Sequence, residues 1–243
     1  SNIYNTFRSP DQELDLRARY ERDYRKYKDL PQPRIVAIDN NVDLHPETQS
    51  VRIDGVYRVR NTHSTPIPDI HVAMGDDRTL VKVDLGGQTL AFHDVDLGYR
   101  IYRLATPLQP GEQRQVHFRV EQRPKGITAG QAPSNIVDNG TFFNSTLLPS
   151  FGYDPRGELE DRNERRKRGL GEPTRMPKLE DEAARANNYI SNDADWLDFR
   201  STICTAPDQI ALAPGYLQEE KTVDGRRCFR YAMDRPMLNF YAY

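Results

Sequence analysis

The chain has 243 residues, and its 34 Lys and Arg nearly balance 36 Asp and Glu, which gives a formal net charge of -2 at pH 7. That balance gives no reason to expect nucleic acid or an anionic membrane as a general partner. No stretch approaches the ~20 apolar residues of a membrane-spanning helix, and no signal-peptide pattern opens the sequence. The sequence predicts a soluble piece that is long enough to bury a real core. Because it begins Ser1-Asn2 without Met, we expect the natural protein to extend upstream.

The first predicted element is a helix that begins after Ser9. Ser9-Pro10-Asp11-Gln12 supplies a capping residue, a proline at the first helical position and the Gln of a capping box. Spacings of 4, 4 and 3 then put one apolar residue and three tyrosines on a single face: Leu16, Tyr20, Tyr24 and Tyr27. This stripe favours docking on a neighbouring surface, with a membrane-adjacent face as the alternative. Prolines end the helix, so residues 1–33 form an N-terminal charged helix and linker.

From residue 34 the pattern changes to the period of two that is typical of strands. Charged residues alternate with apolar ones over 51–60. Pro110-Gly111 predicts a type II turn, and Asp224-Gly225 predicts a tight hairpin turn. Further strands are predicted at 35–38, 70–74, 79–85, 89–94, 99–104, 116–120, 196–205, 220–223 and 227–231. Short strands punctuated by Gly and Pro indicate a mainly β fold, an antiparallel sandwich or saddle, over residues 34–243.

A charged insertion interrupts the β pattern at about residues 156–190. Its two helix-compatible stretches are 158–168 and 178–187. Glu158 with Arg162, and Asp161 with Arg165, have the i, i+4 spacing of ion pairs along a solvated helix. The basic run at 164–168 could contact phosphate, but its acidic flank favours a solvated helix.

The residues that could ligate a metal are scattered. His93-Asp94-Val95-Asp96 comes nearest to a cluster, yet alternation on a strand separates His93 from the two carboxylates, which favours a polar strand end. We therefore predict no metal site in this chain. Cys204 and Cys228 lie in consecutive predicted strands, where they could form a disulfide across the sheet or remain buried free thiols.

The most unusual stretch runs over residues 139–155. It reads Asn-Gly-Thr-Phe-Phe-Asn-Ser-Thr-Leu-Leu-Pro-Ser-Phe-Gly-Tyr-Asp-Pro, with two Gly, two Pro and four aromatic residues. Such a composition is poor material for a regular element and is typical of a shaped turn lined with rings. We expect it to form the edge of the β-domain that faces another molecule or domain. No complete catalytic set occurs in the sequence.

A succession of motifs resembles the N-terminal β-domain of M1 zinc aminopeptidases, the gluzincins, in the branch that is fused to bacterial ABC-2 type transporter permeases. The motifs, in chain order, are Gly55 and Asn61, Leu108-Gln109-Pro110-Gly111-Glu112, Asn139-Gly140-Thr141-Phe142, Leu148-Pro149, Gly152-Tyr153, Ala213-Pro214-Gly215-Tyr216 and residues 236–243. Before them, Tyr20-Glu21-Arg22-Asp23-Tyr24 resembles the segment that leaves the membrane part of such fusions.

The resemblance implies a saddle-shaped antiparallel β-sandwich that caps the substrate cleft of a separate catalytic domain. That domain would hold the zinc, so no cofactor is expected here and this chain should not hydrolyse peptides. Asn139, Gly140 and Thr141 correspond to the loop that contacts the substrate's α-amino group. The Gln or Glu usual in that loop is missing, which puts ordinary aminopeptidase specificity in doubt. Phe142, Phe143 and Tyr153 are expected to contact the catalytic domain.

The partners that follow from the resemblance are a downstream catalytic domain, a peptide substrate of the full-length protein, and a membrane reached through flanking segments. The parent would be a membrane protein with this part as a soluble domain, and we lean toward the extracytoplasmic side. The alternative is a stand-alone β-sandwich that binds protein or glycan through the exposed rings of Phe142, Phe143, Phe151 and Tyr153.

Overall fold

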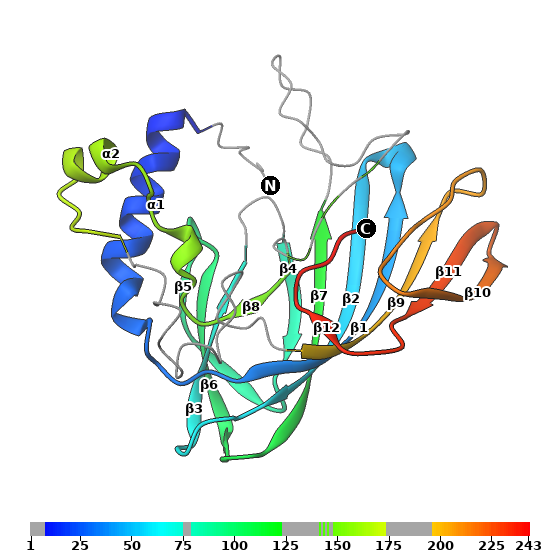
Figure 1. Cartoon of the computed structure of the whole chain (residues 1–243), viewed down its shortest axis with the longest axis horizontal. Helices are drawn as coiled ribbons and strands as arrows, with labels where there is room; N and C mark the ends of the chain where they lie inside the picture. Colours follow the sequence, from blue (N-terminus) through cyan, green and yellow to red (C-terminus); the bar gives the residue numbers. More distant parts are fainter. Residues whose placement is uncertain are drawn as a thin grey trace.

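The computed structural model of the protein describes residues 8–74, 79–122, 141, 143, 145, 148–173 and 196–243. They form one large curved sheet, a smaller sheet and a layer of helices (Figure 1). The helical segments are α1 (Pro10–Tyr24), η1 (Arg25–Tyr27), η2 (Pro46–Thr48), η4 (Pro155–Gly157) and α2 (Arg162–Lys167). The strands are β1 (Arg34–His45), β2 (Ser50–Arg60), β3 (Ile67–Ala73), β4 (Thr79–Asp84), β5 (Gln88–Asp94), β6 (Tyr99–Leu108), β7 (Gln113–Gln122), β8 (Ser150–Phe151), β9 (Trp196–Thr205), β10 (Tyr216–Val223), β11 (Arg226–Ala232) and β12 (Met237–Leu238).

The large sheet has the order β10-β11-β9-β1-β2-β7-β4, with β12 added beside β9. The small sheet has the order β5-β6-β3-β8. The predicted mainly β fold is therefore confirmed, with one departure from a purely antiparallel arrangement. β1 runs parallel to β9, whereas every other pairing of the described strands is antiparallel. A parallel pair needs a long connection, and here the connection spans residues 46–195.

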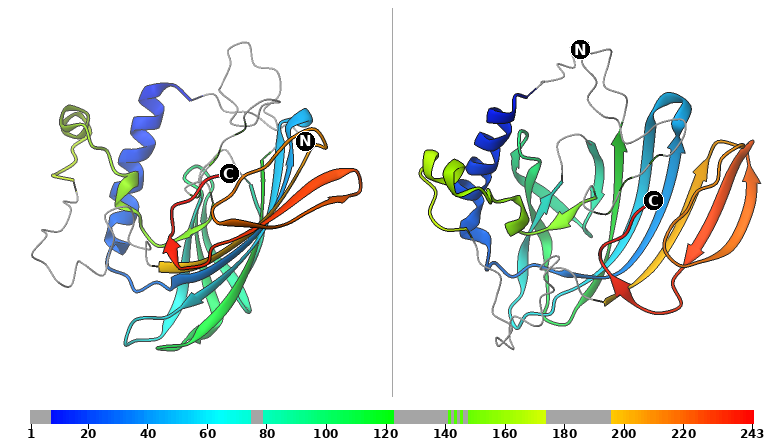
Figure 2. Two further views of the ribbon diagram at one scale, coloured as in Figure 1. Left: turned by 45° about the vertical axis from the view of Figure 1, so that its right-hand side comes forward. Right: turned by 45° about the horizontal axis from the view of Figure 1, so that its top comes forward.

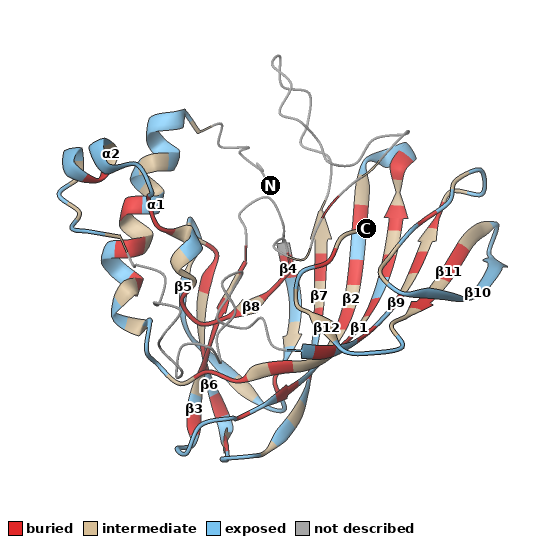
Figure 3. Cartoon of the chain, viewed as in Figure 1, coloured by how far each residue is buried: buried red, intermediate tan, exposed pale blue. Residues whose placement is uncertain are grey.

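The main core lies between the inner faces of the two sheets (Figures 2 and 3). Alternate residues of the strands point inward, as the period of two predicts. In β2, for example, Val51 and Ile53 are buried while Arg52 is exposed. The most buried aliphatic and aromatic members of this core include Ile35, Ile38, Val42, Ile53, Val59, Ile67, Ile70, Val72, Leu108, Val120, Phe199 and Ile203.

Both predicted turns are confirmed by their backbone geometry. Glu112 N–H donates to the Gln109 carbonyl at 2.9 Å, and Gly111 has φ +77°, which is the requirement of a type II turn. Asp224 and Gly225 have φ of 50° and 75°. Two consecutive residues with positive φ make the two-residue hairpin turn that matches strand twist.

Helix α1 begins as predicted, with Ser9 and Gln12 forming a capping box. The tyrosine stripe docks on the small sheet, so the docking prediction is confirmed and the stripe does not face outward. We name this second core the tyrosine cluster; its rings belong to Tyr20, Tyr24, Tyr27, Tyr99 and Tyr153. Tyr24 stacks on Tyr99 with ring centroids 4.1 Å apart, and Tyr20 stacks on Tyr153 at 4.9 Å.

The charged insertion forms less helix than predicted. Helix α2 has six residues, and Glu158 is in an extended conformation with φ -71° and ψ 157°. The predicted pairing of Asp161 with Arg165 is wrong, because Asp161 caps α2 while Arg165 binds Glu21 of α1. Long-range contacts thus override the local helical spacing. The second predicted stretch, 178–187, lies outside the described residues.

Candidate functional site

The described part of the ring-lined stretch begins by pairing with the end of the chain. Phe143 N–H donates to the Tyr243 carbonyl at 3.3 Å, and Tyr243 N–H donates to the Phe143 carbonyl at 2.9 Å. Ser145 N–H donates to the Tyr241 carbonyl at 2.8 Å. Residues 241–243 therefore lie beside this stretch, over the inner face of the large sheet (Figure 2).

A buried polar network holds the same C-terminal residues on the sheet. Asn40 in β1 donates from Nδ2 to the hydroxyls of Tyr241 and Tyr243, each at 3.0 Å. Ser201 in β9 donates to the Tyr243 hydroxyl at 3.0 Å, and neither Asn40 nor Ser201 is exposed at all. Burial raises the pKa of Tyr243 to about 12 and that of Tyr241 well above 10. Both hydroxyls therefore stay neutral and serve as hydrogen-bonding anchors.

Farther along, Leu148-Pro149 leads into β8, which joins the small sheet. Phe151 lies opposite Val72 of β3, and its ring stands 6.2 Å from that of Tyr57. The Tyr57 hydroxyl donates to the Pro149 carbonyl at 3.1 Å. These contacts fix the stretch between the two sheets.

Gly152 turns the chain from the main core toward α1. Its φ of +83° suits glycine, and its N–H donates to the His71 carbonyl at 2.9 Å. Tyr153 then enters the tyrosine cluster and donates to Glu158 Oε1 at 2.7 Å. Burial and the neighbouring Glu158 raise the pKa of Tyr153. The stretch thus contributes to both cores, which its composition alone did not indicate.

Of the predicted substrate-contacting residues, Asn139 and Gly140 lie outside the described residues. Phe142, which was predicted to contact the catalytic domain, also lies outside them. Thr141 is half-buried, and its contact with substrate stays a prediction. Phe143 and Tyr153 are buried within this chain, with 3% and 5% exposure.

The expectation of an exposed platform of rings is wrong for Phe143, Phe151 and Tyr153. All three are buried because they pack against this chain's own strands and helix α1. A contact between Phe143 or Tyr153 and a further domain remains a prediction.

The sequence interpretation missed the residues that anchor the C-terminal segment. Asn40 and Ser201 are polar residues at fully buried strand positions. Asp39-Asn40-Asn41 interrupts the apolar residues of β1, a signal that could have marked an internal hydrogen-bonding position.

Asp94, the nearest candidate for a metal ligand, binds α1. Its carboxylate accepts from both Arg19 Nη atoms, at 2.7 and 3.0 Å, and from the Tyr24 hydroxyl at 2.5 Å. Burial opposes ionisation of Asp94, but these hydrogen bonds outweigh it and lower its pKa. The interpretation as a polar strand end fits these contacts. Within the described ranges, no three His, Cys, Asp or Glu side chains converge as a metal site would require.

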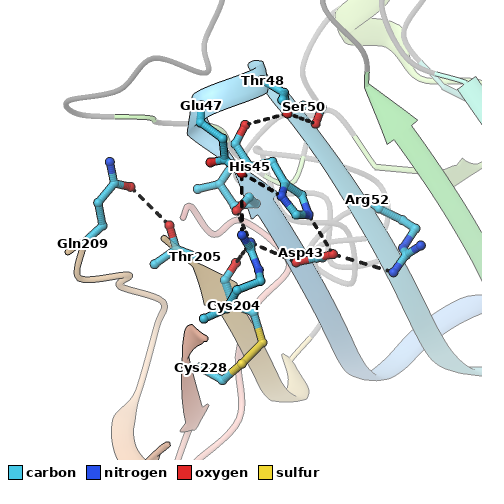
Figure 4. Close-up of polar contacts among 12 residues, drawn as sticks. Asp43, His45, Glu47, Thr48, Ser50, Arg52, Cys204, Thr205, Gln209 and Cys228 are labelled. Atoms are coloured by element: carbon cyan, nitrogen blue, oxygen red, sulfur yellow. Dashed lines mark hydrogen bonds and ion pairs between the residues drawn. A yellow bond between two sulfur atoms is a disulfide. The ribbon is translucent and has the colours of Figure 1, made fainter. Parts of the chain in front are cut away.

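Cys204 and Cys228 form a disulfide, which the sequence had left open. They lie directly opposite each other in the antiparallel pair of β9 and β11, with Cα atoms 4.1 Å apart. Figure 4 shows a charged cluster at the same end of the sheet. There, His45 lies between the carboxylates of Asp43 and Glu47, with a nitrogen-to-oxygen distance of 3.0 Å to each.

The fold resembles that of known peptidases, whereas no family profile and no curated protein matches the sequence. One similar solved structure is the M1 zinc metallopeptidase from Deinococcus radiodurans, with a TM-score of 0.51 and 15% identity. A variant of it bound to a Tyr-Ser-Ala substrate gives a TM-score of 0.53 and 12% identity. Each comparison covers 87% of this chain and 42% of the peptidase chain. The chain thus has the fold of an M1 aminopeptidase N-terminal domain.

Proposed function

We propose that this chain is the non-catalytic N-terminal β-domain of a larger M1-like zinc metallopeptidase, and that it caps the substrate cleft of a catalytic domain. The observation that carries the proposal is the fold, which covers 87% of this chain but only 42% of the Deinococcus radiodurans enzyme. A partner domain would correspond to the part of that enzyme which this chain does not cover. The chain's own residues would shape the cleft, and the zinc would be held elsewhere.

The contacts of residues 241–243 support this arrangement. They are held by Asn40 and Ser201 and paired with Phe143, so the end of the described chain is fixed beside the stretch expected to reach substrate. Substrate positioning depends on rigid geometry. In this proposal Asn139, Gly140 and Thr141 contact the substrate, with Asn139 as the candidate for binding its α-amino group.

We further propose that the parent protein is membrane-associated, as an ABC-2 type permease fusion, and that this domain faces the extracytoplasmic side. The disulfide between Cys204 and Cys228 supports that side, because disulfides persist mainly in oxidising compartments. None of the described helices is long and apolar enough to cross a membrane.

The coding sequence beyond Tyr243 provides the first test. It should encode a helix with His-Glu-x-x-His, the motif that holds zinc and the general base. A gene that ended at Tyr243 would refute the proposal.

Activity of the two-domain protein provides the second test. The extended protein should bind zinc and release amino acids from peptides, whereas residues 1–243 alone should do neither. Asn139→Ala should raise KM for peptides, and Asn41→Ala, a matched change at an exposed strand position, should leave KM unchanged. Equal KM values for both variants would show that Asn139 does not contact substrate, and the domain assignment would be unaffected.

A further inference from the structure

The outer edge of the large sheet is strand β10, at the end of the strand order. Among the described strands, β10 pairs with β11 alone, and all eight of its residues are exposed. Figure 1 shows the β10–β11 hairpin standing at the far side of the sheet. An open edge of this length offers its backbone N–H and C=O groups to another strand.

The hairpin turn determines which backbone groups face outward. Asp224-Gly225 joins Val223 to Arg226, and these two residues lie opposite each other. In a hairpin with a two-residue turn, that closing pair is hydrogen-bonded, and the pairs behind it alternate between bonded and non-bonded. Glu220 and Thr222 therefore direct their backbone groups toward the open edge, where an incoming strand would find them.

The side chains of β10 are complementary to a second copy of the same strand. If two β10 strands lie antiparallel with a two-fold axis at Glu220, Glu219 of each faces Lys221 of the other. Within one strand the two side chains lie 3.7 Å apart as an ion pair, and they are 57% and 56% exposed, so they can also reach a facing strand. Opposite charges placed directly across two strands stabilise the pair, and the two-fold symmetry supplies this contact twice.

The carboxylate on the axis already has a cationic partner within its own chain. Glu220 accepts from Arg227 Nε at 3.0 Å and from Nη2 at 2.5 Å, so the two Glu220 carboxylates would meet already paired with cations. The antiparallel arrangement also brings the apolar end of one strand, with Tyr216 and Leu217 63% and 49% exposed, toward Val223 of the other, which is 42% exposed.

We propose that two copies of this chain associate through β10, antiparallel about Glu220, so that their large sheets join into one. Charged residues and the irregular register at Leu217/Glu219 are features that keep edge strands from pairing at random. Moving the axis to Thr222 would bring Glu220 against Asp224 of the other copy. The charges therefore disfavour that shifted register and match the proposed one.

Charge reversal tests the pairing in the full chain. Lys221→Glu and Glu219→Lys should each raise the dimer dissociation constant about tenfold or more, measured by sedimentation equilibrium. A mixture of the two variants should associate again, because each then supplies the charge that the other needs. Lys28→Glu, at an exposed site far along the chain, should leave the constant unchanged. A wild-type chain that stays monomeric at every concentration overturns the proposal.

Cross-linking tests the register. At the axis, paired Cα atoms lie about 5.5 Å apart, so Glu220→Cys should form an intermolecular disulfide, seen on a non-reducing gel. Thr222→Cys places the two sulfur-bearing residues roughly 14 Å apart and should not. The native cysteines are already bridged to each other. More cross-linking at position 222 than at position 220 contradicts the proposed register.

Discussion

The main core and the tyrosine cluster bury side chains in two different ways. The main core is built largely from aliphatic and aromatic residues at alternate strand positions, where burial of apolar surface alone is favourable. In the tyrosine cluster, ring stacking is combined with hydroxyl groups that need partners. Tyr20 bonds to the backbone of Asp154, Tyr24 to Asp94 and Tyr153 to Glu158.

The helical layer therefore depends on specific polar contacts. The guanidinium of Arg165 in α2 binds Glu21 of α1 with nitrogen-to-oxygen distances of 2.6 and 2.8 Å, and each side chain is only 3% exposed. Removing one partner of such a contact destabilises the protein, because the other partner is left buried and unpaired. The main core, in contrast, should be destabilised chiefly by substitutions that reduce side-chain volume.

The largest effect is expected from Phe199→Ala in the main core. Phe199 is 1% exposed and packs 4.6 Å from the Tyr241 ring, so truncation leaves a cavity and should lower the free energy of unfolding by about 4 kcal/mol. Urea denaturation measures this loss. Phe240→Ala is the matched control, because Phe240 is 50% exposed; an equal loss there would contradict the burial argument.

Breaking the ion pair between Glu21 of α1 and Arg165 of α2 should lower the free energy of unfolding by about 3 kcal/mol. Glu21→Gln removes the charge that compensates Arg165 and leaves that guanidinium buried. Hydrogen exchange should become faster in α1 and α2 while strands β1 and β2 keep their protection. Uniformly faster exchange across both regions would show that the helical layer and the main core unfold as one unit. Asp29→Asn, an exposed site, serves as the control.

Acid should weaken the contact between the small sheet and the tyrosine cluster through His71. Burial lowers the pKa of His71 to about 4, from about 6.5 in an unfolded chain. The unfolded state therefore takes up a proton first as pH falls from 6.5 to 4, and stability present above that window is lost within it. At pH 5 the free energy of unfolding should be lower than its value above this window by about 2 kcal/mol.

The variant His71→Gln isolates this effect. Subtracting its free energy of unfolding from that of the wild-type chain at each pH removes the contribution of groups common to both. The difference should be constant above pH 7 and shrink below pH 6. A difference that stayed constant down to pH 4 would refute the assignment to His71.

A smaller loss is expected from Tyr24→Phe, which keeps the ring and removes the hydroxyl that donates to Asp94. A hydrogen bond to a charged group contributes about 1.5 kcal/mol, and thermal denaturation can measure a change of this size. Tyr216→Phe should have no measurable effect, because Tyr216 is 63% exposed. If Tyr24→Phe had no effect either, the bond from Tyr24 to Asp94 would not contribute to stability.

The main core could be predicted from sequence because alternation and turn residues are local signals. The two turns at Gly111 and Gly225 occur where their composition requires, and Ser9 caps α1. β1 was predicted too short because Asp39, Asn40 and Asn41 follow its apolar run. Asn40 is nonetheless buried, because its side chain donates to the hydroxyls of Tyr241 and Tyr243, which lie 201 and 203 residues away in the sequence.

The candidate site could be predicted only as a place in the chain. The composition of 139–155 indicated a shaped, ring-lined turn, but not that Phe143 would pair with Tyr243 or that Tyr153 would meet α1. Arg165 likewise belonged to a basic run with helical spacing, and its partner Glu21 is 144 residues away. Pairings between distant residues have no local signature, so spacing alone cannot assign them.

The parallel pair of β1 and β9 has a consequence for synthesis of the chain. β1 is complete at His45, but β9 is made only after residues 46–195. Until then the edge of β1 that pairs with β9 stays unpaired, and the large sheet cannot be completed at its centre. Such long-range pairing slows folding and leaves strand edges exposed to other chains. We therefore expect this domain to depend on chaperones during translation more than a sheet of successive hairpins of the same size.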